Sequence, residues 1–147
     1  PLDADTGIPL GSTVDTTHGT VELTSQQKSG GASQTAKFFD GIFLVTQQGP
    51  VINLKLTQKL AKCTAGKANA ARKRPKRRRL WGDGKGRFRT QGKHSAATVV
   101  GTKWLVQDSC AGTLTKVARG VVSVRDFTRH KTIRVKAGKR YLAKPPR

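Results

Sequence analysis

The chain has 147 residues, of which 35% are hydrophobic, and this is enough for one ordinary domain or for two small modules. No run of 18 apolar residues is present, so we expect no membrane-spanning segment in this sequence. The formal net charge of +21 is segregated. Residues 1–71 carry six Lys and Arg against five Asp and Glu, whereas residues 72–147 carry 23 against three. A field of this sign attracts polyanions or requires a neutralising partner.

The residue types favour strands over helices. Glycine occurs 16 times, threonine is abundant, methionine is absent and Glu22 is the only glutamate, a bias that fits strands and turns. The chain begins at Pro1, which indicates a processed product or a fragment. We expect an all-β protein made of two small antiparallel modules of the sandwich or roll type, residues 1–62 and 86–147. A basic connector, residues 63–85, joins them.

The first module begins with a turn-rich lead over residues 1–12. Alternating polar and apolar residues, or short apolar runs, then predict strands at residues 19–24, 34–39, 42–46 and 51–56. The Asp40-Gly41 pair stands between two strand-like runs and predicts a hairpin turn.

The connector contains a run, residues 72–79, in which seven of eight residues are cationic. Pro75 and charge repulsion argue against a long helix here, although a short one fits residues 65–71. The glycine-rich segment at residues 82–86 lacks the spacing of a phosphate-binding loop and is followed by no helical pattern, so it predicts a turn.

The second module shows a regular succession of short strands. They are predicted at residues 86–90, 95–100, 103–107, 113–117, 121–125, 132–135 and 140–143, with a turn at Gly101-Thr102 between the second and third. Glycine-punctuated strands of this length are typical of a roll or sandwich.

The two cysteines, Cys63 and Cys110, allow two interpretations: a pair of buried free thiols or a disulfide. We favour the disulfide, because both residues stand in polar, turn-like stretches where a free thiol gains little from burial. Such a bond would close a loop around the basic run and indicates an oxidising compartment.

Residues 90–143 resemble the FecR-type periplasmic and extracellular β domain. The resemblance rests on V-x-G-T-x-W-x-V at residues 99–106, on G-x-V-x-V at residues 120–124 and on Ala137-Gly138, together with the segments 112–117, 133–135 and 140–142. Residues 80–88, between the two halves, resemble a segment of secreted or surface proteins of actinobacteria. The resemblance implies a non-enzymatic, exported, bacterial β module without catalytic residues.

The cationic residues predict an anion-binding site. The candidates lie in and just after the basic run: Arg72, Lys73, Arg74, Lys76, Arg77, Arg78, Arg79, Arg87 and Arg89. Further cations, among them Lys103, Lys116, Arg119, Arg125 and Arg134, extend the positive surface, several at alternate positions of predicted strands. Trp81 is the only plausible stacking platform, whereas Trp104 is expected in the core. The alternative is a solvated connector or a processing site.

The sequence offers little for catalysis, a cofactor or a metal. Its eight acidic residues are scattered, and His18, His94 and His130 are far apart, with no cysteine or carboxylate at ligand spacing. We therefore expect no enzyme, no cofactor and no metal site.

Two functions remain for a protein of this kind. The first is a structural module of the cell surface or of an extracellular fibre, which forms a homo-oligomer or polymer by strand addition from residues 1–12 to a neighbour. The second is a binding module for an acidic polymer such as extracellular DNA, a phosphate polymer or an acidic polysaccharide. A nuclear or ribosomal role is disfavoured by the β modules and the expected disulfide.

Overall fold

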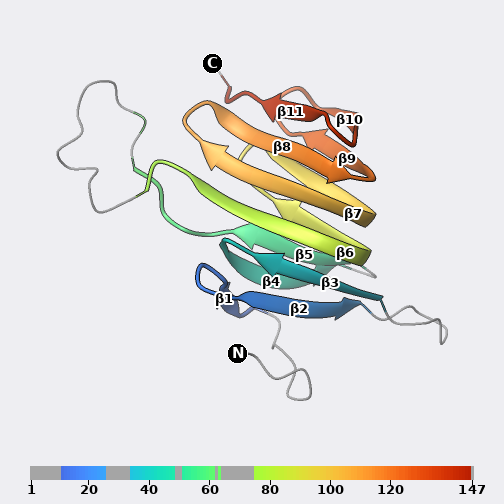
Figure 1. Cartoon of the computed structure of the whole chain (residues 1–147). Helices are drawn as coiled ribbons and strands as arrows, with labels where there is room; N and C mark the ends of the chain where they lie inside the picture. Colours follow the sequence, from blue (N-terminus) through green and yellow to red (C-terminus); the bar gives the residue numbers. More distant parts are fainter. Residues whose placement is uncertain (1–10, 26–33, 49–50, 62, 64–74, 147) are drawn as a thin grey trace.

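The computed structural model describes residues 11–25, 34–48, 51–61, 63 and 75–146 (Figure 1). These residues form eleven β-strands and no helix, which confirms the all-β class. The bounds are β1 Thr13–Asp15, β2 Thr20–Ser25, β3 Gln34–Phe39, β4 Ile42–Gln48, β5 Val51–Leu56, β6 Arg78–Gln91, β7 Ser95–Ser109, β8 Gly112–Arg119, β9 Val121–Asp126, β10 Lys131–Lys136 and β11 Arg140–Ala143.

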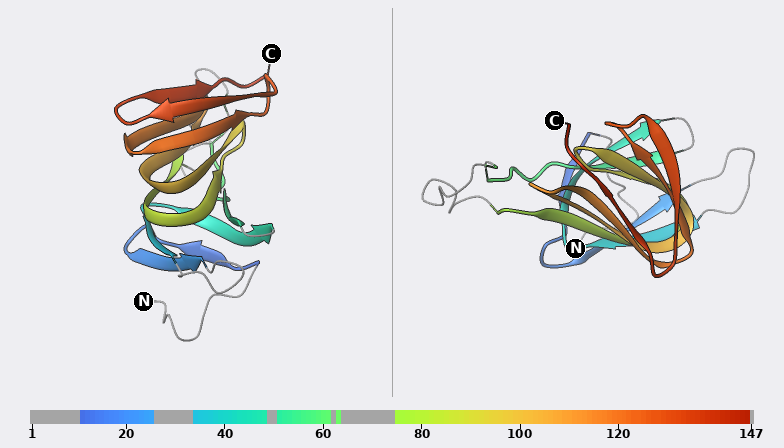
Figure 2. Two further views of the ribbon diagram at one scale, coloured as in Figure 1. Left: turned by 90° about the vertical axis from the view of Figure 1, so that its right-hand side faces the viewer. Right: turned by 90° about the horizontal axis from the view of Figure 1, so that it is seen from above.

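Two long strands, β6 and β7, hold the molecule together. They pair antiparallel over most of their length, and each end of the pair carries a different set of neighbours. The first half of β6 pairs with β3 and the second half of β7 with β8, giving a front layer of β2, β3, β6, β7, β8 and β11. The second half of β6 pairs with β5 and the first half of β7 with β9, giving a back layer of β1, β4, β5, β6, β7, β9 and β10. Figures 1 and 2 show the strands stacked from β1 and β2 at one end to β10 and β11 at the other.

The Asp40-Gly41 turn is present, but the predicted hairpin is wrong. Strand β3 pairs with β2 and β6, whereas β4 pairs with β1 and β5, so the chain crosses from the front layer to the back layer at this turn. Asp40 has a φ of 67°, and a Cβ on Gly41 would overlap the carbonyl oxygen of Arg79. The close approach of two backbones therefore requires glycine here.

Two predicted turns lie inside long strands. Residues 82–86, predicted as a turn, belong to β6, and Gly101-Thr102 belongs to β7. Because β6 begins at Arg78, the last eight residues of the predicted connector, 78–85, are also part of this strand. A Cβ on Gly82 would lie 2.5 Å from the Trp104 ring. Gly84 and Gly86 have positive φ values, and the β6–β7 register shifts between Lys85 and Phe88. The glycines thus provide the bend that carries β6 from one layer to the other.

One hydrophobic cluster fills the space between the layers. Phe38 of the front layer lies against Phe43 and Phe88 of the back layer, with ring centroids 6.1 and 5.1 Å apart. Trp104 is fully buried in this cluster, as predicted, and its indole Nε1 donates a hydrogen bond to Thr90. The predicted division into two modules is not confirmed, because one sheet and one core include strands from both halves.

The predicted disulfide is present between Cys63 and Cys110, whose Cα atoms are 5.5 Å apart. It joins the segment after β5 to the turn between β7 and β8. Residues 64–74 of the connector, including the predicted short helix at 65–71, lie outside the described residues. Within the described ranges, no helix is long and apolar enough to cross a membrane.

Candidate anion-binding surface

The outward-facing side chains of the front layer form three rows across the strands. We call this surface the front face. The first row runs Phe39, Trp81, Leu105, Lys116 and Arg140 on β3, β6, β7, β8 and β11. The second row is Lys37, Asp83, Lys103 and Arg119, and the third is Arg79, Gln107, Leu114 and Leu142. The register of the sheet alone thus brings cations from five strands around a short apolar row.

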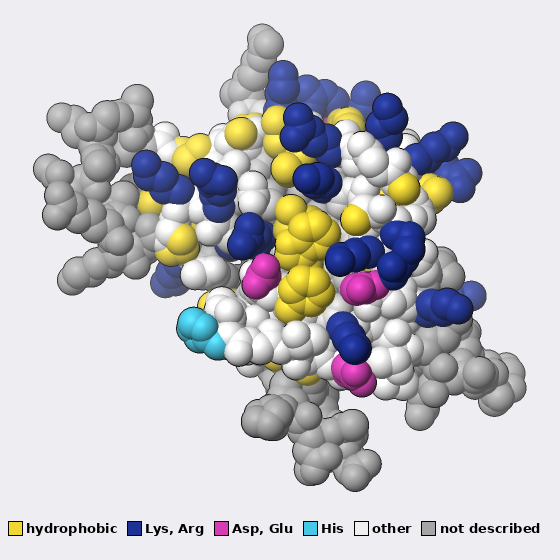
Figure 3. All heavy atoms as spheres, in the orientation of Figure 1, with side chains coloured by type: hydrophobic (Ala, Val, Ile, Leu, Met, Phe, Trp, Pro, Cys, Tyr) yellow, Lys and Arg dark blue, Asp and Glu magenta, His cyan; other side chains and the backbone are white. Residues whose placement is uncertain are grey.

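The apolar part of the front face is centred on two aromatic rings. Phe39 and Trp81 are half-buried, and their rings are nearly parallel, 8° apart, with centroids separated by 6.3 Å. The Lys103 Nζ lies 5.9 Å from the Trp81 ring centroid, within the range of a cation–π contact. Figure 3 shows hydrophobic side chains in the middle of this face, with Lys and Arg on both sides.

Carboxylates neutralise only part of the positive charge on the front face. Three ion pairs lie there: Lys37 with Glu22, Arg79 with Asp40, and Arg119 with Asp83. No carboxylate of the described residues pairs with Lys116 or Arg140. These two exposed side chains stand directly opposite each other on β8 and β11, a like-charge pair that destabilises a sheet.

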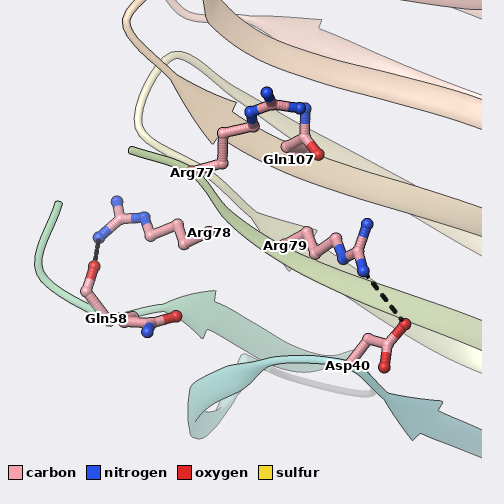
Figure 4. Close-up of a pocket in the computed structure, with 6 residues that line it drawn as sticks. All are labelled: Asp40, Gln58, Arg77, Arg78, Arg79 and Gln107. Carbon is pink, nitrogen blue, oxygen red and sulfur yellow. Dashed lines mark hydrogen bonds and ion pairs between the residues drawn. The ribbon is translucent and has the colours of Figure 1, made fainter. Parts of the chain in front are cut away.

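A pocket of about 310 Å³ opens at the start of β6. It is lined by Asp40, Gln58, Arg77, Arg78, Arg79 and Gln107. Figure 4 shows that the three consecutive arginines diverge, Arg77 toward Gln107, Arg78 toward Gln58 and Arg79 toward Asp40. The pocket therefore adjoins the third row of the front face, and Arg77 adds an exposed guanidinium beside it.

Arg78 is engaged inside the protein. Its Nε and Nη2 lie 2.8 Å from Oδ2 of Asp108, and its Nη1 donates to the Gln58 carbonyl at 2.9 Å. The buried Asp108 also accepts hydrogen bonds from the Lys93 backbone N–H and from the Thr113 hydroxyl. We call this set the Asp108 network; it fixes the start of β6 against β7 and β8. Arg78 is thus a structural cation rather than a free anion ligand.

A second buried carboxylate, Asp126, has a similar role at the β9–β10 turn. Burial opposes its ionisation, but hydrogen bonds from Tyr141 Oη (2.5 Å) and from the backbone N–H groups of Thr128 and Arg129 outweigh burial and lower the pKa of Asp126. Burial and the hydrogen bond to Asp126 raise the pKa of Tyr141. The carboxylate also forms an ion pair with Arg129, so its charge is compensated locally.

The other predicted anion-binding residues are dispersed. Arg72, Lys73 and Arg74 lie outside the described residues. Lys76 is exposed just before β6. Arg87 and Arg89 lie at and beyond the bend of β6, where the strand joins the back layer, and Arg89 has an interaction within the protein. The structure therefore brings Arg77 and Arg79 to the front face and separates them from Arg87 and Arg89.

Phe39 and Arg140 belong to the front face, although no motif in the sequence marks either residue as part of a site. Each is an ordinary outward residue of a short strand, and only the pairing of β3 with β6 and of β11 with β8 places it there. Strand alternation was the available signal, but it does not identify which strands are neighbours.

Searches with this chain of protein-family models, of curated proteins and of solved structures gave no match. The resemblance to the FecR-type domain therefore stays a prediction from the sequence, and the candidate surface rests on this chain's own geometry.

Proposed function

We propose that this protein is a non-enzymatic, exported binding module for acidic polymers and that the front face is its binding surface. The observation that carries the proposal is the register of β7, β8 and β11. It places Lys103 opposite Arg119, and Lys116 opposite Arg140, on one exposed surface. A polyanion laid across these strands would relieve the repulsion between Lys116 and Arg140, which no carboxylate of the described residues offsets, and would release its own counterions.

The extent of the surface suits a polymer better than a small ligand. The cations are spread over β6, β7, β8 and β11, and neighbouring strands are about 4.8 Å apart. Binding through such a surface depends on charge density and falls steeply with salt. The pocket beside Arg77 and Arg79 offers one further place for a phosphate or carboxylate group.

The test compares two double variants with the same loss of charge. Lys116→Gln with Arg140→Gln removes the like-charge pair of the front face. Arg125→Gln with Arg134→Gln removes two exposed cations of the back layer. We expect the front variant to weaken binding of inorganic polyphosphate about tenfold and to reduce the salt slope by about two, whereas the control changes affinity by less than about threefold.

Equal effects of the two double variants would mean that net charge, rather than the front face, attracts the polymer. No binding of polyphosphate, heparin or oligonucleotide by the unmodified protein at low salt would overturn the proposed function.

Head-to-tail assembly is a second candidate, supported by the unpaired edges of the stack. Among the described strands, β2 pairs only with β3, and it carries Glu22 but no cation, which would suit the addition of a further strand at this edge. At the other end, β10 carries Lys131, Arg134 and Lys136, and cations on an edge strand discourage strand addition. The proposed donor, residues 1–12, lies almost entirely outside the described residues. Sedimentation at high salt tests the alternative: assembly through strands predicts oligomers that persist, and a polyanion binder predicts monomers.

A further inference from the structure

The front face differs from a purely electrostatic surface in its two aromatic rings. Phe39 and Trp81 project from neighbouring strands, are half-buried and lie with their rings nearly parallel. The apolar row continues into Leu105, which is 7% exposed. A binder of simple phosphate or carboxylate chains has no need of aromatic surface among its cations, so these rings indicate a ligand with rings of its own.

Cations surround the ring pair at distances that suit a charged backbone. Lys103 lies over the Trp81 ring, and Lys116 is the neighbour of Leu105 on β8, about 10 Å from the Trp81 strand. Arg79 is two residues before Trp81, on the same side of β6 and about 7 Å away along the strand. Aromatic rings on an exposed sheet, bordered by cations, are the arrangement with which sheet proteins hold unpaired bases.

A double helix uses less of this surface than a single strand does. It can approach the broad side of the sheet only through its phosphates, because its bases are stacked and paired inside the duplex. The rings of Phe39 and Trp81 reach only bases that have left the base stack. An acidic polysaccharide offers carboxylates or sulfates to the cations but no planar base to the two rings. Single strands therefore fit better than duplexes or acidic polysaccharides.

We infer that the polymer held by the front face is a single-stranded nucleic acid whose bases contact Trp81 and Phe39 while its phosphates contact Lys103, Lys116 and Arg140. This inference rests on the proposed function, because it names the ligand class of the same surface. It adds a role for the aromatic pair that the cations alone do not require.

The experiment uses Trp81 both as a probe and as the site of substitution. Trp104 is fully buried, so quenching of tryptophan fluorescence by a ligand reports on Trp81. We expect an oligothymidylate to quench the fluorescence and to bind about tenfold tighter than an inorganic polyphosphate with the same number of phosphates. Trp81→Leu should abolish the quenching, weaken oligothymidylate binding about tenfold and affect polyphosphate binding far less.

Trp104 emission at the short wavelength of a buried indole, shifting to longer wavelength in denaturant, shows that Trp81→Leu still folds. Phe39→Leu provides an independent substitution of the other ring. Equal affinity for the two polymers, or equal loss of both in the Trp81 variant, would overturn the inference and leave the proposed function standing. Tighter binding of heparin than of oligothymidylate would overturn it in favour of a polysaccharide. Absence of binding to all three probes would instead contradict the proposed function.

Discussion

Arg78 and Arg79 are adjacent in one cationic run, yet they belong to two different regions of the molecule. Arg78 belongs to the Asp108 network, where a buried carboxylate and a backbone carbonyl take up its guanidinium. Arg79 lies on the front face, half-exposed, beside Asp40 at 3.7 Å. Adjacent cations of one run thus differ in role: Arg78 is held inside the protein by a buried carboxylate, whereas Arg79 keeps an exposed guanidinium beside a half-exposed carboxylate.

The disulfide between Cys63 and Cys110 lies near the Asp108 network, since Cys63 follows Gln58 by five residues and Cys110 follows Asp108 by two. Reduction, or Cys63→Ser with Cys110→Ser, should lower the free energy of unfolding by about 4 kcal/mol, because the bond spans 47 residues and restricts the unfolded chain. Urea denaturation with and without reductant measures the effect. Binding at the front face should survive in the folded, reduced protein. A loss below about 1 kcal/mol would contradict this role of the disulfide.

Substituting the two neighbouring arginines gives the most direct test of the comparison. Arg78→Ala leaves the buried Asp108 without its cation and should cost about 3 kcal/mol of unfolding free energy. Arg79→Ala removes an exposed pair and should cost less than about 1 kcal/mol. Chemical denaturation of the two variants, matched in size and charge, measures the difference. Similar losses of unfolding free energy in the two variants would contradict the assignment of Arg78 to the structure and of Arg79 to the surface.

The buried Asp126, like Asp108, is held by interior hydrogen bonds, and these bonds make the stability of the fold depend on pH. The lowered pKa of Asp126 stabilises the fold above about pH 4, the pKa of an unfolded aspartate, and this contribution is lost as the pH falls through the folded-state value. The raised pKa of Tyr141 stabilises the fold below about pH 10, and this contribution is lost as the pH rises further.

Removing the hydroxyl that links the two groups tests both contributions. Tyr141→Phe should cost about 2 kcal/mol at neutral pH and should flatten the stability profile at its acidic and alkaline ends. Denaturant midpoints measured between pH 3 and pH 11 would record the profile. An unchanged slope in acid would show that Tyr141 does not support the ionised form of Asp126.

Front-face cations should contribute least to stability. Lys116→Gln, alone or with Arg140→Gln, relieves a like-charge pair, and the free energy of unfolding should stay within about 0.5 kcal/mol or rise slightly. Thermal unfolding of the same variants used for the binding test gives the measurement. A large loss of stability would assign these side chains to the structure rather than to a ligand.

Much of the fold follows from local patterns. Alternation at residues 19–24 and 51–56 predicted strands that the structure contains at Thr20–Ser25 and Val51–Leu56, and the apolar neighbours of Trp104 predicted its burial. The disulfide was inferred from the polar surroundings of Cys63 and Cys110. The predicted strands in the second half correspond to β6 through β11, although three of them, residues 86–90, 95–100 and 103–107, are parts of longer strands.

Other features were decided by contacts between distant residues. The glycines at residues 82–86 have the local character of a turn, but pairing with β3 and β7 and the Trp104 ring beside Gly82 make this segment a strand. Asp40-Gly41 has the character of a hairpin, but the neighbours of β3 and β4 are other strands. Local sequence gives no information on which strand becomes a neighbour, because pairing depends on burial across the whole core.

By itself, the sequence determined that this chain is a β protein with a basic second half, because strand alternation, glycine spacing and net charge are local or additive properties. Only the tertiary structure decided which cations are structural and which surround the aromatic pair. The neighbours of a side chain across a sheet come from strands far apart in the chain, and the register of those strands sets whether a cation faces Asp108 or another cation.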